Sequence, residues 1–216
     1  EYNPETVFSS IDQQGRYSFL NQPKIIKWNL ARFAECIITL IDDNKDKAIE
    51  VATETINSFE KIYEEKWLNM MRDKLGLFGE DIMDKELIMN LLNWMYKNKA
   101  DYTNTFCFLM NEKFAFSEKF NNEDFLVWKK EWKIRLKLNN NNEKKYLELM
   151  RSVNPLLIPR NHKVEEALEA ANKSDFIPMK NLIEVLRKPY NNQSNISGFQ
   201  YTGSIKNKKY QTFCGT

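Results

Sequence analysis

Residues 10–32 read SIDQQGRYSFLNQPKIIKWNLAR, and this stretch joins a polar, glycine-containing loop to the start of a helix. Asn21 is a residue type that caps helices, and Pro23 suits the first helical turn because its φ is already near the helical value. Apolar residues then recur every three or four positions as far as Ile41, which predicts one amphipathic helix. The chain therefore enters a helical region directly after the loop.

The same spacing predicts helices over most of the remaining chain. The longest is expected from Asp46 to about Leu75, with Gly76 ending it. The other expected helices are one capped by Asp84, one capped by Asp101, one from about Asn122 to Leu138, one around Tyr146 to Met150 that ends at Asn154-Pro155, one capped by Asn161, and one opened by Pro178 and closed by Pro189.

No convincing pair of strands and no internal repeat is evident, so the expected fold class is all-α. Three parts are expected: a loop over residues 1–22, a helical domain over 23–189 and a basic, flexible tail over 190–216. From Val185 onward the sequence has no Asp or Glu, although several Lys and Arg residues follow. The tail is therefore locally basic.

Composition limits the classes of partner and compartment. The formal charge is +2, from 32 basic and 30 acidic residues, which gives no field directed at nucleic acid or an anionic membrane. No apolar run is long enough to cross a bilayer. Three cysteines do not make a disulfide framework, which favours a reducing compartment and a cytoplasmic location, or a mitochondrial one in a eukaryote. The chain starts at Glu1 without Met, which is consistent with processing or with a fragment of a longer protein.

Few residues are candidates for chemistry. Neither glycine-rich phosphate-binding motif occurs, and acidic pairs such as Glu64-Glu65 are expected on solvated helix faces. The single histidine, His162, lies just inside a predicted helix start, which favours a surface or capping role. Trp128 and Trp132 lie on one helical stripe and are expected in the core, although aromatic and lysine residues on one helix would also suit nucleic acid. No catalytic, cofactor-binding or metal-binding residue is assigned.

Four separated blocks resemble the selenoprotein O family, in the order that the family has them. They are residues 10–32, residues 74–77 (KLGL), residues 101–106 (DYTNTF), and residues 154–190 with the terminal FCGT at 213–216. Members of that family are kinase-like proteins that attach AMP to other proteins. The resemblance extends from near the first residue to the last.

The resemblance implies a kinase-like fold and transfer of AMP from ATP, bound with Mg²⁺ or Mn²⁺, to Ser, Thr or Tyr hydroxyls of proteins. Residues 1–22 would be a remnant of the activation segment, and its positioning residues would be Asp12, Gly15, Arg16, Tyr17, Asn21 and Gln22. The family's ATP-binding and metal-binding residues would lie upstream of Glu1, in an N-terminal kinase-like part that would be this chain's intramolecular partner. The isolated chain is therefore expected to be inactive.

Cys214 occupies the place where many animal members of the family have selenocysteine, which implies a redox role. Some members pair this position with a cysteine of the activation segment, but the matching stretch here, residues 5–10, has none. The basic tail would also favour an accessible thiolate. Two readings of the whole chain stay open: the C-terminal helical portion of a protein adenylyltransferase, or a separate helical module that binds a protein partner without catalysis.

Overall fold

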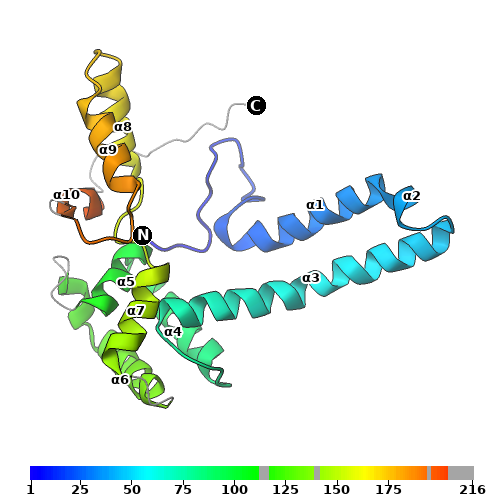
Figure 1. The fold of residues 1–216 in the computed structure, drawn as a ribbon, viewed down its shortest axis with the longest axis horizontal. Coiled ribbons are helices and arrows are strands. Elements are labelled where there is room, and N and C mark those ends of the chain that lie inside the picture. The colour runs from blue at the N-terminus through cyan, green and yellow to red at the C-terminus, as the bar shows by residue number, and fades with distance from the viewer. Residues whose placement is uncertain (112–116, 139–141, 194–195, 204–216) are drawn as a thin grey trace. The chain divides into compact units, whose positions relative to one another are not determined.

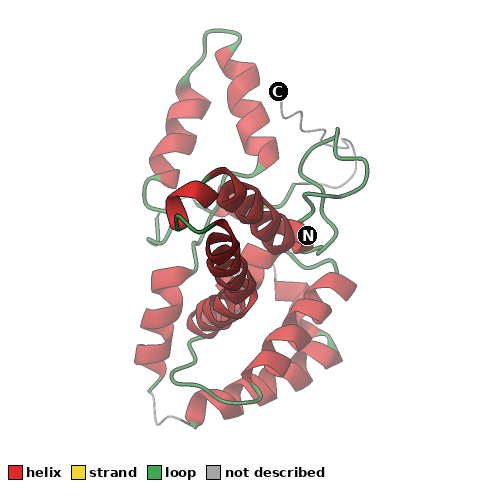
Figure 2. Ribbon diagram, turned by 90° about the vertical axis from the view of Figure 1, so that its right-hand side faces the viewer, coloured by secondary structure: helices red, strands yellow, loops and turns green. Residues whose placement is uncertain are grey.

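The computed structural model describes residues 1–111, 117–138, 142–193 and 196–203. These residues form helices and loops, with no strand among them (Figure 2). The predicted all-α class is therefore confirmed. None of the described helices has the length and apolar content that crossing a bilayer requires. The elements, labelled in Figure 1, are η1 (Phe19–Asn21), α1 (Gln22–Cys36), α2 (Ile38–Ile41), α3 (Lys45–Lys74), α4 (Asp84–Lys97), α5 (Tyr102–Met110), η2 (Ser117–Asn121), α6 (Glu123–Lys137), α7 (Glu143–Val153), α8 (Asn161–Ala171), α9 (Ile177–Leu186) and α10 (Ser197–Gln200).

The described residues fall into two compact units. One comprises residues 3–70, which include the opening loop, α1, α2 and most of α3. The other comprises residues 1–2 and 71–203, which include the last turn of α3 and helices α4 to α10. Each unit is described separately below.

In the unit of residues 3–70, the single helix predicted to reach Ile41 is interrupted. At Ile37 the backbone leaves helical values (φ −109°, ψ 10°), and its N–H bonds to the Ala34 carbonyl three residues back. Three β-branched residues, Ile37, Ile38 and Thr39, follow one another here, and such residues weaken a helix. The prediction of one continuous helix was therefore wrong, and α1 and α2 take its place.

Helix α3 is the longest described helix, with 30 residues, and ends where Gly76 was predicted to end it. Gly76 has φ +70°, a conformation that glycine adopts without strain. Its N–H bonds to the Asp73 carbonyl, and the Leu77 N–H bonds to the Arg72 carbonyl. These two bonds form a Schellman motif, which satisfies carbonyls that the helix end would otherwise leave unpaired.

The core of the other unit is built around α4 and α6. Trp128 and Trp132 are 4% and 2% exposed, which confirms their predicted burial and leaves neither ring free to stack on a base. The Trp128 indole N–H donates to the Leu87 carbonyl at 2.8 Å, and that of Trp132 donates to the Leu75 carbonyl at 2.9 Å. The large rings are therefore buried with their polar atoms satisfied.

The predicted helix caps divide into two groups. The carboxylate of Asp101 accepts from the Asn104 N–H, so this cap is confirmed. Asn122 was predicted only as the approximate start of its helix, and its amide oxygen also caps α6 by accepting from the Phe125 N–H. Asp84 and Asn161 do not cap: they are the first residues of their helices, preceded by Met83 and Arg160. Asp84 fails as a cap because two arginines bind its carboxylate.

Helices α8 and α9 form an antiparallel hairpin (Figure 1), and Pro178 lies in the first turn of α9 as predicted. Beyond it, α10 was not predicted, because a helix of four residues is too short to show a periodic pattern. Its Gln200 is buried, accepts a hydrogen bond from the Asn104 amide on its backbone carbonyl, and donates its own amide to the Leu156 carbonyl. These contacts fix α10 against α5 and against the segment that contains Leu156.

Candidate functional site

The loop before α1 is organised by the carboxylate of Asp12. Its two oxygens accept from the backbone N–H groups of Arg16 and Tyr17, each at 2.8 Å. Gly15, which lies between Asp12 and Arg16, has φ +65°, and this conformation lets the chain reverse inside a short turn. A single side chain therefore fixes the path of residues 12–17.

Two amide side chains hold the loop from the helix side. The Asn21 amide donates to the Gly15 carbonyl at 2.9 Å, and the Gln22 amide donates to the Tyr17 carbonyl. Asn21 does occupy the cap position of α1, but its side chain makes no capping bond, so that part of the prediction was wrong. Its amide bonds to the loop because the turn brings the Gly15 carbonyl within reach.

The loop also returns to the segment that precedes it. The Phe19 N–H donates to the Thr6 carbonyl and the Leu20 N–H to the Pro4 carbonyl, both at 2.9 Å. Since these bonds are between backbone groups, they close the loop whatever the side chains are. Residues 4–22 therefore form a closed structure in front of α1.

Arg16 and Tyr17 are among the exposed side chains of this loop. The Arg16 guanidinium lies over the Trp28 ring of α1, 4.8 Å from its centroid. Arg32, one turn further along α1, faces the same ring at 5.5 Å. Such cation–π contacts contribute about 0.5–1 kcal/mol at exposed sites. They orient the Arg16 guanidinium and leave it accessible.

The six residues proposed from the sequence as positioning residues thus lie in one loop. All six take part in four hydrogen bonds, in which Asp12, Asn21 and Gln22 use their side chains and Gly15, Arg16 and Tyr17 their backbone. Across the described part of the chain, no three His, Cys, Asp or Glu side chains are grouped closely enough to hold a metal ion. This arrangement fixes the shape of the loop and leaves the Arg16 guanidinium and the Tyr17 phenol exposed to solvent.

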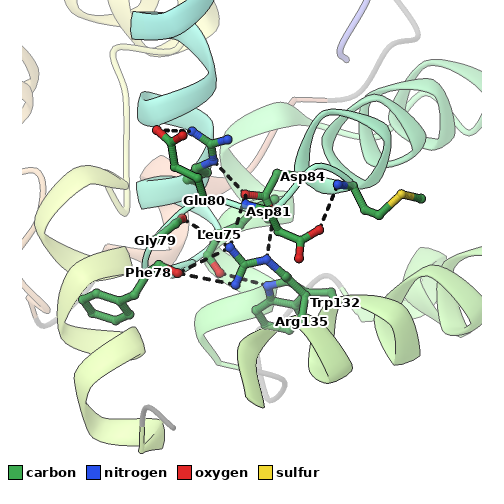
Figure 3. A network of polar contacts seen from close by, with 10 residues as sticks. Leu75, Phe78, Gly79, Glu80, Asp81, Asp84, Trp132 and Arg135 are labelled. Carbon is green, nitrogen blue, oxygen red and sulfur yellow. Dashed lines mark hydrogen bonds and ion pairs between the residues drawn. The ribbon is translucent and has the colours of Figure 1, made fainter. Parts of the chain in front are cut away.

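A second polar centre was missed by reasoning from the sequence. The carboxylate of Asp84 is 1% exposed and binds two arginines, Arg72 and Arg135, each through Nε at 2.7 Å (Figure 3). It also accepts from the Asp81 N–H. Burial alone would raise the pKa of Asp84, but the hydrogen bonds from Arg135 and Arg72 outweigh it and lower the pKa.

Arg135 extends this centre to the loop after α3. Its guanidinium donates to the carbonyls of Phe78 and Gly79 as well as to Asp84 (Figure 3). The centre therefore joins the end of α3, the following loop, α4 and α6. It satisfies backbone carbonyls of the loop between α3 and α4, which is a structural role. In the sequence, only the presence of Arg135 on the otherwise apolar stripe of α6 could have indicated it.

Three of the stretches that resemble the family, residues 74–77, 101–106 and 154–190, lie in the unit of residues 71–203. Arg160 pairs with Asp101 through two nitrogens, and its Nη2 also donates to the Asn104 side chain at 3.0 Å. The Asn154 amide donates to the Lys74 carbonyl at 2.9 Å across 80 positions of sequence. Burial would raise the pKa of Asp101, but the Arg160 guanidinium lowers it.

Lys74 is the unusual member of this cluster, because its ammonium is buried at 8% exposure. It lies over two aromatic rings, 4.4 Å from the centroid of Phe106 and 5.2 Å from that of Tyr102. Burial lowers the pKa of Lys74 to about 8, and the nearby Cys107 thiol opposes this. Burial likewise raises the pKa of Cys107 to about 12, so this thiol is held protonated and unreactive.

The two other candidates from the sequence are placed as follows. His162 is the second residue of α8 and half-buried, with its ring edge-on to Tyr201, and burial together with Lys163 and Arg160 lowers its pKa. This agrees with the predicted position near a helix start. Cys214 lies outside the described residues, so its redox role stays a prediction.

Comparison with known proteins identifies the family of this chain. The family model described as "Protein adenylyltransferase SelO" matches residues 1–187. Proteins named protein nucleotidyltransferase YdiU are 56% identical in Pelagibacter ubique over 215 residues, 46% in Nitrosococcus oceani over 216 and 44% in Clostridium beijerinckii over 215. Each match covers 100% of this chain and 44% of the relative, so the chain spans less than half the length of these relatives. The chain therefore belongs to the SelO family of protein adenylyltransferases.

Proposed function

We propose that this chain is the helical portion of a protein adenylyltransferase that transfers AMP from ATP to Ser, Thr or Tyr hydroxyls of other proteins. The observation that carries the proposal is the similarity of the whole chain, at 44–56% identity, to proteins named as nucleotidyltransferases. Those relatives are bacterial, and a cytoplasmic location is part of the proposal.

Residues 1–22 would serve as part of an activation segment, and the loop of residues 12–22 lies within it. Its hydrogen bonds fix the backbone of Arg16 and Tyr17 without using the guanidinium or the phenol. A fixed loop with an accessible cation suits a site where negatively charged phosphates or a protein substrate must be oriented. In this proposal Asp12, Asn21 and Gln22 are positioning residues for that loop.

ATP and its Mg²⁺ or Mn²⁺ ions would be bound by another part of the protein. Transfer of a nucleotidyl group needs metal ions and cations arranged around the phosphates. The sequence contains no glycine-rich phosphate loop. The isolated chain is therefore proposed to lack AMP transfer and to bind ATP weakly.

The unit of residues 3–70 offers a surface to which that other part can bind. Only Ser18 and Ala48 are buried in this unit, although α1 has an apolar stripe along its length. Ile26, Leu30 and Phe33 on that stripe are 44%, 38% and 60% exposed. Burying apolar area of this kind is the main favourable term in association. We assign this stripe to contact with the ATP-binding part of the same protein.

An AMP-transfer assay tests the proposed function. The full-length protein is incubated with Mg²⁺ or Mn²⁺, ATP labelled on its α-phosphate and a cell lysate as acceptor, and the 216-residue chain is assayed in parallel. Labelled proteins are expected with the full-length protein alone. Failure to label under both metals would favour the alternative, a helical protein-interaction module, which the exposed apolar stripe of α1 also suits.

A further inference from the structure

Helices α4 and α6 pack together, and residues of both line a groove. Two hollows of about 370 and 390 Å³ adjoin one another along it, because Asn90 and Glu131 line both. Neither hollow belongs to the loop described as the candidate site. The groove is therefore a separate surface feature of the protein.

The groove is lined by one face of each helix. On α4 the lining residues include Met83, Leu87 and Asn90, and on α6 they include Glu131 and Ile134. Their spacing of three and four residues is that of a single helical face. The lysines of α6 at positions 130, 133 and 137 are not among the lining residues. The groove thus has a composition different from that of the rest of α6.

Large apolar side chains of this groove are exposed to solvent. Ile134 is 63% exposed, Leu138 61%, Met83 55% and Val127 52%. Isolated exposed apolar residues are ordinary on protein surfaces, but here four of them line one continuous depression. A depression of this kind offers apolar area that a partner can bury, which favours association.

The border of the groove is acidic. Asp81, Glu86, Asp124 and Glu131 line it, against the single exposed cation Lys97. The other charged lining residues, Asp84 and Arg135, are buried and paired with each other. Within the described ranges, Glu86, Asp124 and Glu131 form no ion pair. The hollow lined by Met83, Leu87 and Ile134 has a mainly apolar floor, and the adjoining hollow has Asn90 and Asn93 in its lining. With its unpaired acidic border, the groove is complementary to an apolar segment that carries cations on its edges.

We propose that this groove binds a basic amphipathic helix of another protein. The floor would take the apolar stripe of that helix, and lysines or arginines beside the stripe would face Glu86, Asp124 and Glu131. The face of α4 from Met83 to Lys97 extends for about 20 Å at 1.5 Å per residue, which matches a helix of three to four turns. This docking site does not depend on the AMP-transfer activity.

Two designed peptides test the proposal on the full-length protein. Both are fluorescein-labelled 16-residue helices with leucine at positions i, i+3, i+4 and i+7, and they differ in carrying Lys or Glu on both sides of that stripe. Fluorescence anisotropy should give the Lys peptide an affinity at least tenfold higher than the Glu peptide. Its affinity should also fall with added salt, because exposed charges are screened.

Matched variants locate the binding. Glu86→Lys with Glu131→Lys should weaken the Lys peptide at least tenfold. Glu143→Lys with Glu169→Lys makes the same change of net charge on α7 and α8, outside the groove, and should change the affinity less than threefold.

Three results would overturn the proposal. They are equal affinity for the two peptides, an equal effect of the two double variants, and no binding of the Lys peptide at 1 mM. Self-association of the protein that Glu86→Lys with Glu131→Lys abolishes would assign the groove to a second copy, and would overturn it as well.

Discussion

Arg160 binds Asp101 across 59 positions of sequence, with Nη1 on one carboxylate oxygen and Nη2 on the other at 2.9 Å. The same Asp101 carboxylate accepts the Asn104 N–H and thereby caps α5. One buried side chain thus fixes both the start of α5 and the segment that leads into α8. A bidentate pair of this kind is strong and geometrically specific.

Replacing Arg160 by Met should destabilise the unit of residues 71–203 by about 3–5 kcal/mol, because the Asp101 carboxylate would remain largely buried without its cation. The change is measured as the free energy of unfolding in urea. Lys163→Met breaks the exposed Lys163–Glu166 pair and should cost no more than about 1 kcal/mol. Equal losses in the two variants would contradict the assigned role of Arg160.

Asp84→Asn should make the free energy of unfolding less dependent on pH in the acidic range. The pKa of Asp84 is lower in the folded protein than the unfolded value of about 3.9. Its carboxylate therefore contributes stability fully above about pH 4, and this contribution is lost as pH falls through the folded pKa. Unfolding in urea at pH 7 and pH 3 should show a larger difference between wild type and variant at pH 7. A constant difference would argue against the linkage.

Lys74→Met should be more stable than wild type at pH 7, and this advantage should shrink in alkali. The folded pKa of Lys74, about 8, lies below the unfolded value of about 10.4, so the penalty for burying its charge is present below pH 8 and disappears between these values. The decrease should be about 3 kcal/mol. Comparing the two proteins at each pH removes the opposite contribution of Tyr102, whose pKa is raised. An advantage independent of pH would contradict this assignment.

Gly76→Ala should destabilise the protein by at least about 2 kcal/mol. Its φ of +70° disfavours a side chain, and an added Cβ would lie 3.0 Å from the Tyr146 carbonyl oxygen and from Met150 Cγ. Gly198→Ala provides the control, since no heavy atom lies within 4 Å of its added Cβ. That variant should be neutral or slightly more stable in thermal unfolding. If Gly76→Ala behaved in the same way, the Schellman end of α3 would not be required.

Asp12→Ala should reduce AMP transfer by the full-length protein at least about tenfold, because misplacing a loop near a reacting centre by about 1 Å can cost that much or more. Asp12 anchors two backbone N–H groups, and alanine anchors neither. Gln14→Ala changes an exposed residue of the same loop and should leave transfer unchanged. A normal rate for Asp12→Ala, with normal stability, would remove the loop from the proposed function.

Interactions within four residues of sequence were largely predictable. The helical spacing, the stop at Gly76 and the cap Asp101 each depend on neighbours along the chain, and the structure confirms them. The burial of Trp128 and Trp132 followed from their common stripe. The family was identified because its motifs are continuous stretches of sequence.

Only the tertiary structure decided which long-range partners the polar side chains have. Asp84 was predicted to be a cap, but the fold brings Arg72 and Arg135 to its carboxylate from 12 and 51 positions away, and these charged hydrogen bonds outweigh a capping bond. Asn21 bonds to the Gly15 carbonyl because a turn brings the two together. The acidic groove joins faces of α4 and α6, whose alignment depends on how the helices pack. Sequence spacing determines the face of a helix on which a residue lies, but the path of the whole chain determines what that face contacts.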